Sequence, residues 1–115
     1  MSLEIKYSIT SESTLEIKPV GEVDIYTSPE LKNKIFGLIE EKNQDITING
    51  EYLEYIDSTG LGVLMGIYKK LQEKNLNIKV INLKPNIYKL FDITGLNKVF
   101  NIQGWYNGEN KINHS

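Results

Sequence analysis

The sequence of 115 residues lacks cysteine and arginine and contains one histidine, His114. The absence of cysteine excludes disulfides, thiolate nucleophiles and cysteine metal sites, and it permits an intracellular location. Residues next to a terminus seldom keep a fixed geometry, so His114 is a poor candidate for general-base catalysis or metal binding. Because all thirteen cationic side chains are lysine, the chain lacks the planar guanidinium group, which binds a phosphate through two parallel hydrogen bonds.

Charge and hydrophobic runs exclude further classes of partner. The formal net charge is −2, whereas nucleic acids and anionic membranes are bound by a concentrated positive surface. No stretch approaches the ~20 apolar residues that cross a bilayer, and the first residues alternate where a signal peptide would be continuously apolar. We therefore expect a soluble, cytoplasmic protein with no metal or cofactor and with neither nucleic acid nor membrane as a primary partner.

The composition favours one compact domain, because 40% of the residues are hydrophobic. Alternating apolar residues predict a hairpin of two strands at 5–9 and 15–19, and Ser28 and Pro29 supply an N-cap and a first-turn proline for a helix. Gly95 is expected to end a short helix that begins at Pro85. The predicted elements are strands at 5–9, 15–19, 45–49, 77–83 and 99–102, and helices at 28–43, 58–75 and 85–95.

This order of elements predicts an α/β fold with a mixed, mostly parallel sheet of about five strands and with helices packed on it. The predicted domain covers residues 1–102, and residues 103–115 form a tail without a clear period. In open sheets of this kind, functional loops gather beyond the carboxyl ends of the parallel strands. Asp24 and Ser58 are both expected at that edge.

Ser58 follows an apolar extended run and precedes the longest helical pattern, so its hydroxyl should face solvent at a helix N-terminus. The free backbone N–H groups and the dipole of a helix start favour an attached phosphate. The alternative is capping alone, since Asp57, Ser58 and Thr59 are all preferred N-cap types. The chain offers Ser58 no activating histidine and no Ser-x-x-Lys motif, so a base and a phosphoryl donor should come from another protein.

Two glycines inside the same helix, Gly62 and Gly66, each cost up to ~1 kcal/mol relative to alanine. They either allow close packing within the domain or keep a surface flat, so that a partner docks beside Val63 and Ile67. Neighbouring carboxylates such as Asp24 and Glu22 are typical of solvated turns when taken singly. The chain has no phosphate-binding loop, so nucleotide chemistry is not expected.

Three separated segments carry a resemblance to a known family: Gly-Glu-Val-Asp-Ile-Tyr-Thr-Ser-Pro at 21–29, Tyr-Ile-Asp-Ser-Thr-Gly-Leu-Gly-Val-Leu at 55–64, and Leu-Phe-Asp-Ile-Thr-Gly-Leu at 90–96. Together they resemble the anti-sigma factor antagonists, which are single STAS-domain proteins of bacteria. The resemblance extends to about Ile102. Family members commonly end with another helix, but the glycines and asparagines of 103–115 argue against one here, and Trp105 and Tyr106 are expected to fold back onto the sheet.

The resemblance implies a partner-switching protein. In this family, the unmodified antagonist binds an anti-sigma factor that is also a serine kinase, and this binding releases a sigma factor. The phosphorylated serine maps onto Ser58, with Thr59 as a secondary acceptor, and a PP2C-type phosphatase restores the active form. ATP and magnesium belong to the kinase, and the antagonist is expected to be a monomer when free. The implied partner-binding residues are Asp24, Asp57, Ser58, Thr59, Gly60, Gly62 and Val63.

Two alternatives to this function remain. A STAS scaffold or ligand-sensing module of a larger regulatory assembly would need no sigma factor. A small enzyme would use Ser58 or the nearby carboxylates, but the missing base and phosphate loop argue against it. We therefore expect a binding module and phosphorylation substrate instead of an enzyme.

Overall fold

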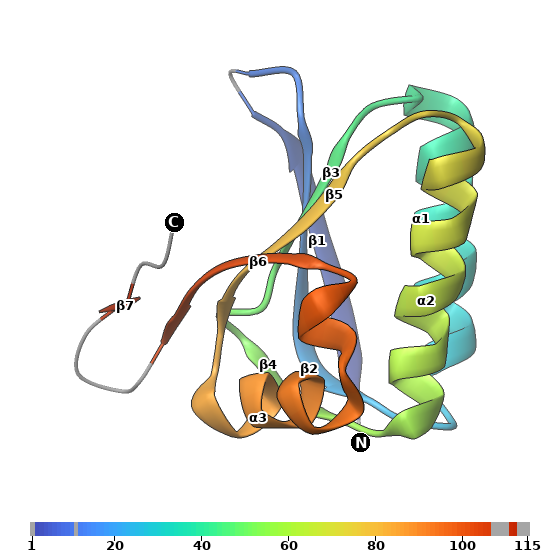
Figure 1. Ribbon diagram of the computed structural model, residues 1–115. Helices are drawn as coiled ribbons and strands as arrows, with labels where there is room; N and C mark the ends of the chain where they lie inside the picture. The colour runs from blue at the N-terminus through green and yellow to red at the C-terminus, as the bar shows by residue number, and fades with distance from the viewer. Residues whose placement is uncertain (1, 11, 107–110, 113–115) are drawn as a thin grey trace.

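The computed structural model describes residues 2–10, 12–106 and 111–112 of the chain. These residues form one mixed sheet with helices on one of its faces (Figure 1). No helix in these ranges is long and apolar enough to cross a membrane. The strands are β1 (Leu3–Ile9), β2 (Leu15–Val23), β3 (Ile46–Asn49), β4 (Leu53–Ile56), β5 (Ile78–Leu83), β6 (Asn101–Tyr106) and β7 (Lys111–Ile112), and the helices are α1 (Ser28–Lys42), α2 (Ser58–Glu73), α3 (Pro85–Thr94) and the short 3-10 helix η1 (Leu96–Lys98).

The sheet is mostly parallel, as predicted. Its order is β1-β2-β3-β5-β6-β7. The remaining strand, β4, pairs with the last residues of β2, whereas β3 pairs with the first residues of β2. The hairpin of β1 and β2 is antiparallel, whereas β2 with β3, β3 with β5, and β5 with β6 are parallel. Two strands, β4 and β7, were not predicted. The last predicted strand, at 99–102, was placed too early, because η1 occupies 96–98 and β6 continues to Tyr106. The backbone of Trp105 and Tyr106 belongs to β6, but their side chains lie outside the described part of the chain.

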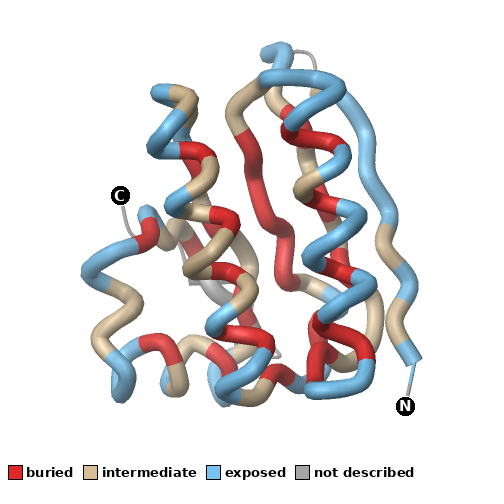
Figure 2. Tube along the Cα trace, turned by 90° about the vertical axis from the view of Figure 1, so that its right-hand side faces the viewer, coloured by how far each residue is buried: buried red, intermediate tan, exposed pale blue. Residues whose placement is uncertain are grey.

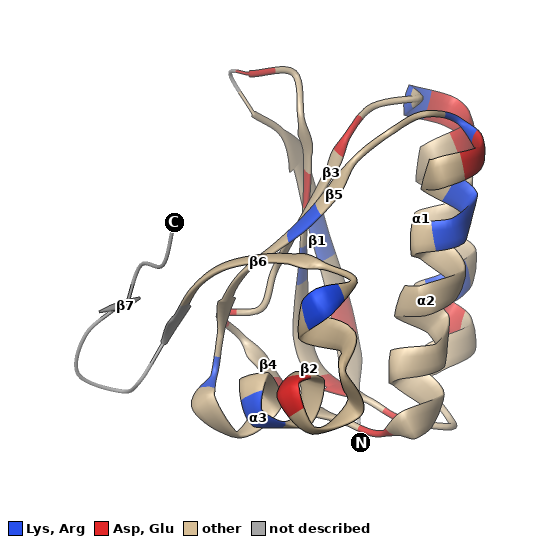
Figure 3. Cartoon of the chain, viewed as in Figure 1, with Lys and Arg blue, Asp and Glu red and all other residues tan. Residues whose placement is uncertain are grey.

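Helices α1 and α2 lie side by side against one face of the sheet, and α3 closes its lower end (Figures 1 and 2). The predicted apolar face of α1 is buried there, because Leu31, Ile35, Leu38 and Ile39 are at most 4% exposed. Acidic and basic side chains are mixed at the C-terminal ends of both helices (Figure 3). There Glu40 accepts from Lys70 at 2.9 Å and lies 3.7 Å from Lys74.

The helices begin and end close to the residues that the sequence predicted, with one difference. Thr27 occupies the N-cap position of α1, so Ser28 is the first helical residue and not the cap. The reason lies in the preceding loop, where the Thr27 hydroxyl is engaged by Glu22 and Asp24. Gly95 ends α3 in a left-handed conformation, as predicted, with φ of 79°.

The sequence left two explanations open for Gly62 and Gly66 of α2. At Gly66, which is half-buried, an added Cβ would lie 3.9 Å from Phe36 Cζ, an ordinary contact distance, so close packing does not require a glycine there.

Close packing occurs instead at Gly60, earlier in the same helix. Gly60 packs internally, because a Cβ there would lie 2.6 Å from Ile56 Cγ1 and 2.7 Å from Val23 Cγ1. Gly62 is exposed, and outside its own helical turn no atom of the described residues lies within 4 Å of an added Cβ. Placing Ile67 on a docking face was wrong, since it is fully buried. It shares a helical stripe with Leu64 and Leu71 at spacings of three and four.

Alanine substitutions should therefore have opposite effects at the two glycines. Gly60→Ala should destabilise the fold by about 1–3 kcal/mol, because the new methyl group overpacks the contact with β2 and β4. Gly62→Ala, the matched control, should stabilise it by up to about 1 kcal/mol through helix propensity alone. Urea unfolding of both variants measures the difference. Equal changes in the free energy of unfolding would contradict this explanation of the glycines.

Candidate functional site

The candidate site lies where β2 and β4 end next to each other. The two strands are parallel, with Val23 opposite Ile56, and the register shifts between Gly21 and Glu22. Beyond the last pair, the Asp57 N–H donates to the Val23 carbonyl at 3.2 Å. The loop after β2 and the first turn of α2 are thereby fixed side by side, at the carboxyl edge that the sequence indicated.

Ser58 is the first residue of α2, but it does not cap the helix. Asp57 occupies the N-cap position, and its Oδ1 accepts from the Gly60 N–H at 3.0 Å. Ser58 is exposed, and within the described residues its hydroxyl and its backbone N–H have no hydrogen-bond partner. Capping alone therefore does not account for a serine at this position, because the neighbouring aspartate performs it.

Asp24 was expected on the docking surface, but its side chain is turned inward and is only 4% exposed. Its Oδ1 accepts from the N–H groups of Tyr26 at 2.8 Å and Thr27 at 3.0 Å. The Thr27 hydroxyl accepts from the Asp24 N–H and donates to the Glu22 carbonyl. A short polar side chain that bonds its own turn is favoured in such loops. Asp24 therefore holds the shape of the loop, and its buried side chain offers little surface for docking.

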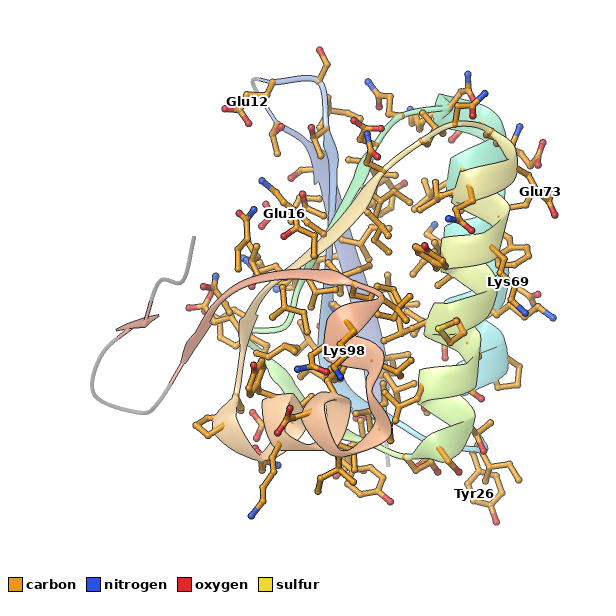
Figure 4. All side chains as sticks on the ribbon, in the orientation of Figure 1. Glu12, Glu16, Tyr26, Lys69, Glu73 and Lys98 are labelled. Atoms are coloured by element: carbon orange, nitrogen blue, oxygen red, sulfur yellow. The ribbon has the colours of Figure 1, made fainter. Side chains whose placement is uncertain are left out.

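That loop presents two large apolar residues which sequence reasoning did not single out. Ile25 is 61% exposed and Tyr26 is 83% exposed. The Tyr26 side chain extends away from the domain at the end where α2 begins (Figure 4). The sequence signal was available: two bulky apolar residues follow Asp24 directly, in a loop where polar residues are usual. Exposed apolar residues that gather near one another are typical of protein interaction sites.

An open groove of about 380 Å³ adjoins Ser58. Ser58 and Leu61 of α2 line one side of it, and Ile87 and Leu90 of α3 line the other. Sequence reasoning missed this groove because it exists only once α3 is placed against β4 and α2. Its complete lining consists of Tyr55, Ile56, Asp57, Ser58, Leu61, Asn86, Ile87, Leu90 and Thr94.

The remaining predicted site residues differ in accessibility. Thr59 and Gly62 are exposed on the first turns of α2, whereas Asp57 and Val63 are half-buried. Gly60 is buried against β2 and β4, so it shapes the helix start and offers a partner no surface. In the ranges that the structure describes, no three histidine, cysteine or acidic residues are grouped so that they could hold a metal ion.

Asp24 should make the loop sensitive to acid. The hydrogen bonds from the N–H groups of Thr27 and Tyr26 lower the pKa of its carboxyl below the ordinary value of 3.8, against the opposing effect of burial. Because the folded-state pKa is the lower one, ionised Asp24 stabilises the fold above about pH 4, and this contribution is lost as the pH falls further.

Asp24→Asn keeps the shape and an acceptor oxygen but removes the charge. It should be less stable than the wild type near pH 7, and the gap should shrink towards about pH 3. Denaturant unfolding at both pH values measures the gap. A gap that stays constant across this range would show that the charge of Asp24 does not support the loop.

Comparison with known proteins agrees with the geometry. The STAS domain model matches residues 7–107. An anti-sigma-B factor antagonist of Staphylococcus epidermidis is 36% identical over 102 residues, which cover 89% of this chain and 94% of that protein.

Two solved structures share the fold. SpoIIAA in its unphosphorylated form superposes with a TM-score of 0.76 at 23% identity, covering 92% of this chain and 90% of that one. SpoIIAA of Bacillus in the phosphorylated form gives a TM-score of 0.70 at 23% identity, covering 92% and 94%. With the family match over most of its length, the chain belongs to the STAS-domain family, among the anti-sigma factor antagonists.

Proposed function

We propose that the protein is a partner-switching antagonist controlled by phosphorylation of Ser58. Unmodified, it binds an anti-sigma factor that is also a serine kinase, and a sigma factor is released. Phosphorylation ends this complex, and a PP2C-type phosphatase reverses the modification. The observation that carries the proposal is the exposed hydroxyl of Ser58, which makes no hydrogen bond within the described residues.

The relatives support a switch in this fold. The Staphylococcus epidermidis relative is named as an antagonist of an anti-sigma-B factor, which is itself a protein partner. SpoIIAA has a structure in a phosphorylated form, so a domain of this shape accommodates a phosphoryl group. We transfer both properties to this chain as part of the proposal.

The start of α2 suits a residue that gains negative charge. Within the described residues, the N–H groups of Ser58 and Thr59 have no acceptor, and they stand at the positive end of the helix dipole. A phosphoryl group of about −1.5 to −2 charges is therefore offset within the domain, even beside Asp57. Phosphorylation should change the surface and leave the fold intact.

At an interface the same charge is unfavourable. A partner packed over Ser58 would have to desolvate the phosphoryl group, and among the described residues no lysine lines the groove to offset it. A loss of about 3 kcal/mol in binding free energy weakens a complex by more than a hundredfold. That change is sufficient for a switch.

We place the partner over the groove beside Ser58 and over the neighbouring loop. Leu61, Ile87 and Leu90 offer apolar surface within the groove, and Tyr26 offers a large exposed ring at the adjacent loop tip. Aromatic residues are enriched among those that dominate binding energy at interfaces. The base, the ATP and the magnesium come from the kinase, and the pair acts in the cytoplasm.

The acceptor can be tested with a neighbouring residue as the control. The cognate kinase with ATP should phosphorylate the wild type and Thr59→Ala to the same extent but leave Ser58→Ala largely unmodified, because Ser58 is the main expected acceptor and Thr59 only a secondary one. Intact mass and peptide mapping measure the modification. Normal phosphorylation of Ser58→Ala would contradict the proposal.

A further inference from the structure

The outer strand β1 has a free edge. It is the terminal strand of the sheet, and within the described residues only β2 pairs with it. In Figure 2 it runs along the right-hand side of the molecule, largely exposed, beside α1. A free edge offers unpaired backbone groups to another strand.

The register of the hairpin shows which residues of β1 face outward. The Leu15 N–H donates away from β1, to Asp45, whereas the Glu22 N–H donates towards it, to Ser2. Even-numbered residues of β2 therefore bond β1, and they lie opposite the even-numbered residues of β1. It follows that Leu3, Ile5, Tyr7 and Ile9 direct their N–H and C=O groups to the free edge.

The side chains of β1 divide between its two faces. Leu3 and Ile5 are half-buried, while Tyr7, on the same face, is 45% exposed. On the other face, Glu4 and Lys6 are exposed and form no ion pair within the described residues. Lys6 instead lies directly opposite Lys18 of β2. Like charges in such cross-strand positions are unfavourable.

We propose that a second copy of this chain pairs with β1, antiparallel, about a two-fold axis at Ile5. Leu3 of each copy then faces Tyr7 of the other, and the two Ile5 residues face each other, so every outward backbone group of these residues gains a partner. Glu4 of each copy stands opposite Lys6 of the other, in the closely spaced positions between hydrogen-bonded pairs. The second copy thus brings a carboxylate to a lysine that lies opposite Lys18 and forms no ion pair within the described residues.

The charges select this register. A two-fold axis at Glu4 or at Lys6 would place identical charges opposite each other. An axis at Tyr7 would leave Glu4 and Lys6 each facing an uncharged residue. A lysine on an edge strand often prevents pairing, but here Glu4, two residues away, is complementary to it in the antiparallel arrangement. The pairing uses none of the residues of the Ser58 site.

A single strand pair is a small interface, so the dimer should be weak and should depend on concentration. This proposal differs from the expectation that the antagonist is a monomer when free, and the two are distinguished by the experiment below. The association does not require the proposed phosphorylation, and the two ideas are tested separately.

Charge reversal provides the test. Sedimentation velocity over a range of concentrations should show dimerisation of the wild type. Glu4→Lys and Lys6→Glu should each weaken it about tenfold, because two ion pairs become two repulsions. Both side chains are exposed, so circular dichroism should stay unchanged. Thermal unfolding should stay unchanged for Glu4→Lys and rise slightly for Lys6→Glu, which places a carboxylate opposite Lys18 of the same chain.

Two complementary experiments identify the pairing. The double variant Glu4→Lys/Lys6→Glu should dimerise like the wild type, and an equal mixture of the two single variants should form mixed dimers in which every facing pair is opposite in charge. A wild type that stays monomeric, single variants that dimerise normally, or a mixture that fails to associate would overturn the proposal. Stronger dimerisation of Lys6→Ala would also overturn it, since that result would show that Lys6 prevents strand pairing at the free edge.

Discussion

The candidate site depends on the parallel contact between the ends of β2 and β4. Val23 and Ile56 are paired there, and the Asp57 N–H extends the contact to the Val23 carbonyl. Gly60 then packs on both side chains, at a distance that a methyl group could not occupy. This contact fixes the loop after β2 and the start of α2 to one another, so that a partner meets a single preformed surface.

Around this contact, neighbouring polar residues have separate roles. Asp57 caps α2, and Asp24 shapes the loop from inside, where its Oδ1 binds two backbone N–H groups. Ser58 neither caps the helix nor shapes the loop, so its hydroxyl is available for modification. A modification at Ser58 therefore changes the charge of the surface while the bonds that maintain the fold stay in place.

The sequence predicted the order of the main elements, because each has a clear period and clear ends, such as Pro85 and Gly95. It also predicted that Ser58 begins an exposed helix start. It missed β4 as a strand, since only four residues form it and two of them are exposed.

The predictions that were wrong or missing at the site depend on tertiary packing, which local sequence patterns do not show. Asp24 is buried by the loop that it bonds, and Ile67 is covered although it lies beside glycines. The groove needs α3, which is distant in sequence, and no local pattern places α3 next to Ser58. Local patterns thus indicated which residues begin and end the elements, while packing decided which of them reach the surface.

The central claim is that one phosphoryl group on Ser58 changes partner binding without changing the fold. The most direct measurement is calorimetric titration of the cognate kinase with unmodified protein and with protein phosphorylated on Ser58, together with thermal unfolding of both forms. The account predicts at least a hundredfold weaker binding after phosphorylation, equivalent to about 3 kcal/mol, with a nearly unchanged unfolding temperature. Equal affinities of the two forms, or weakened binding that accompanies unfolding of the domain, would contradict it.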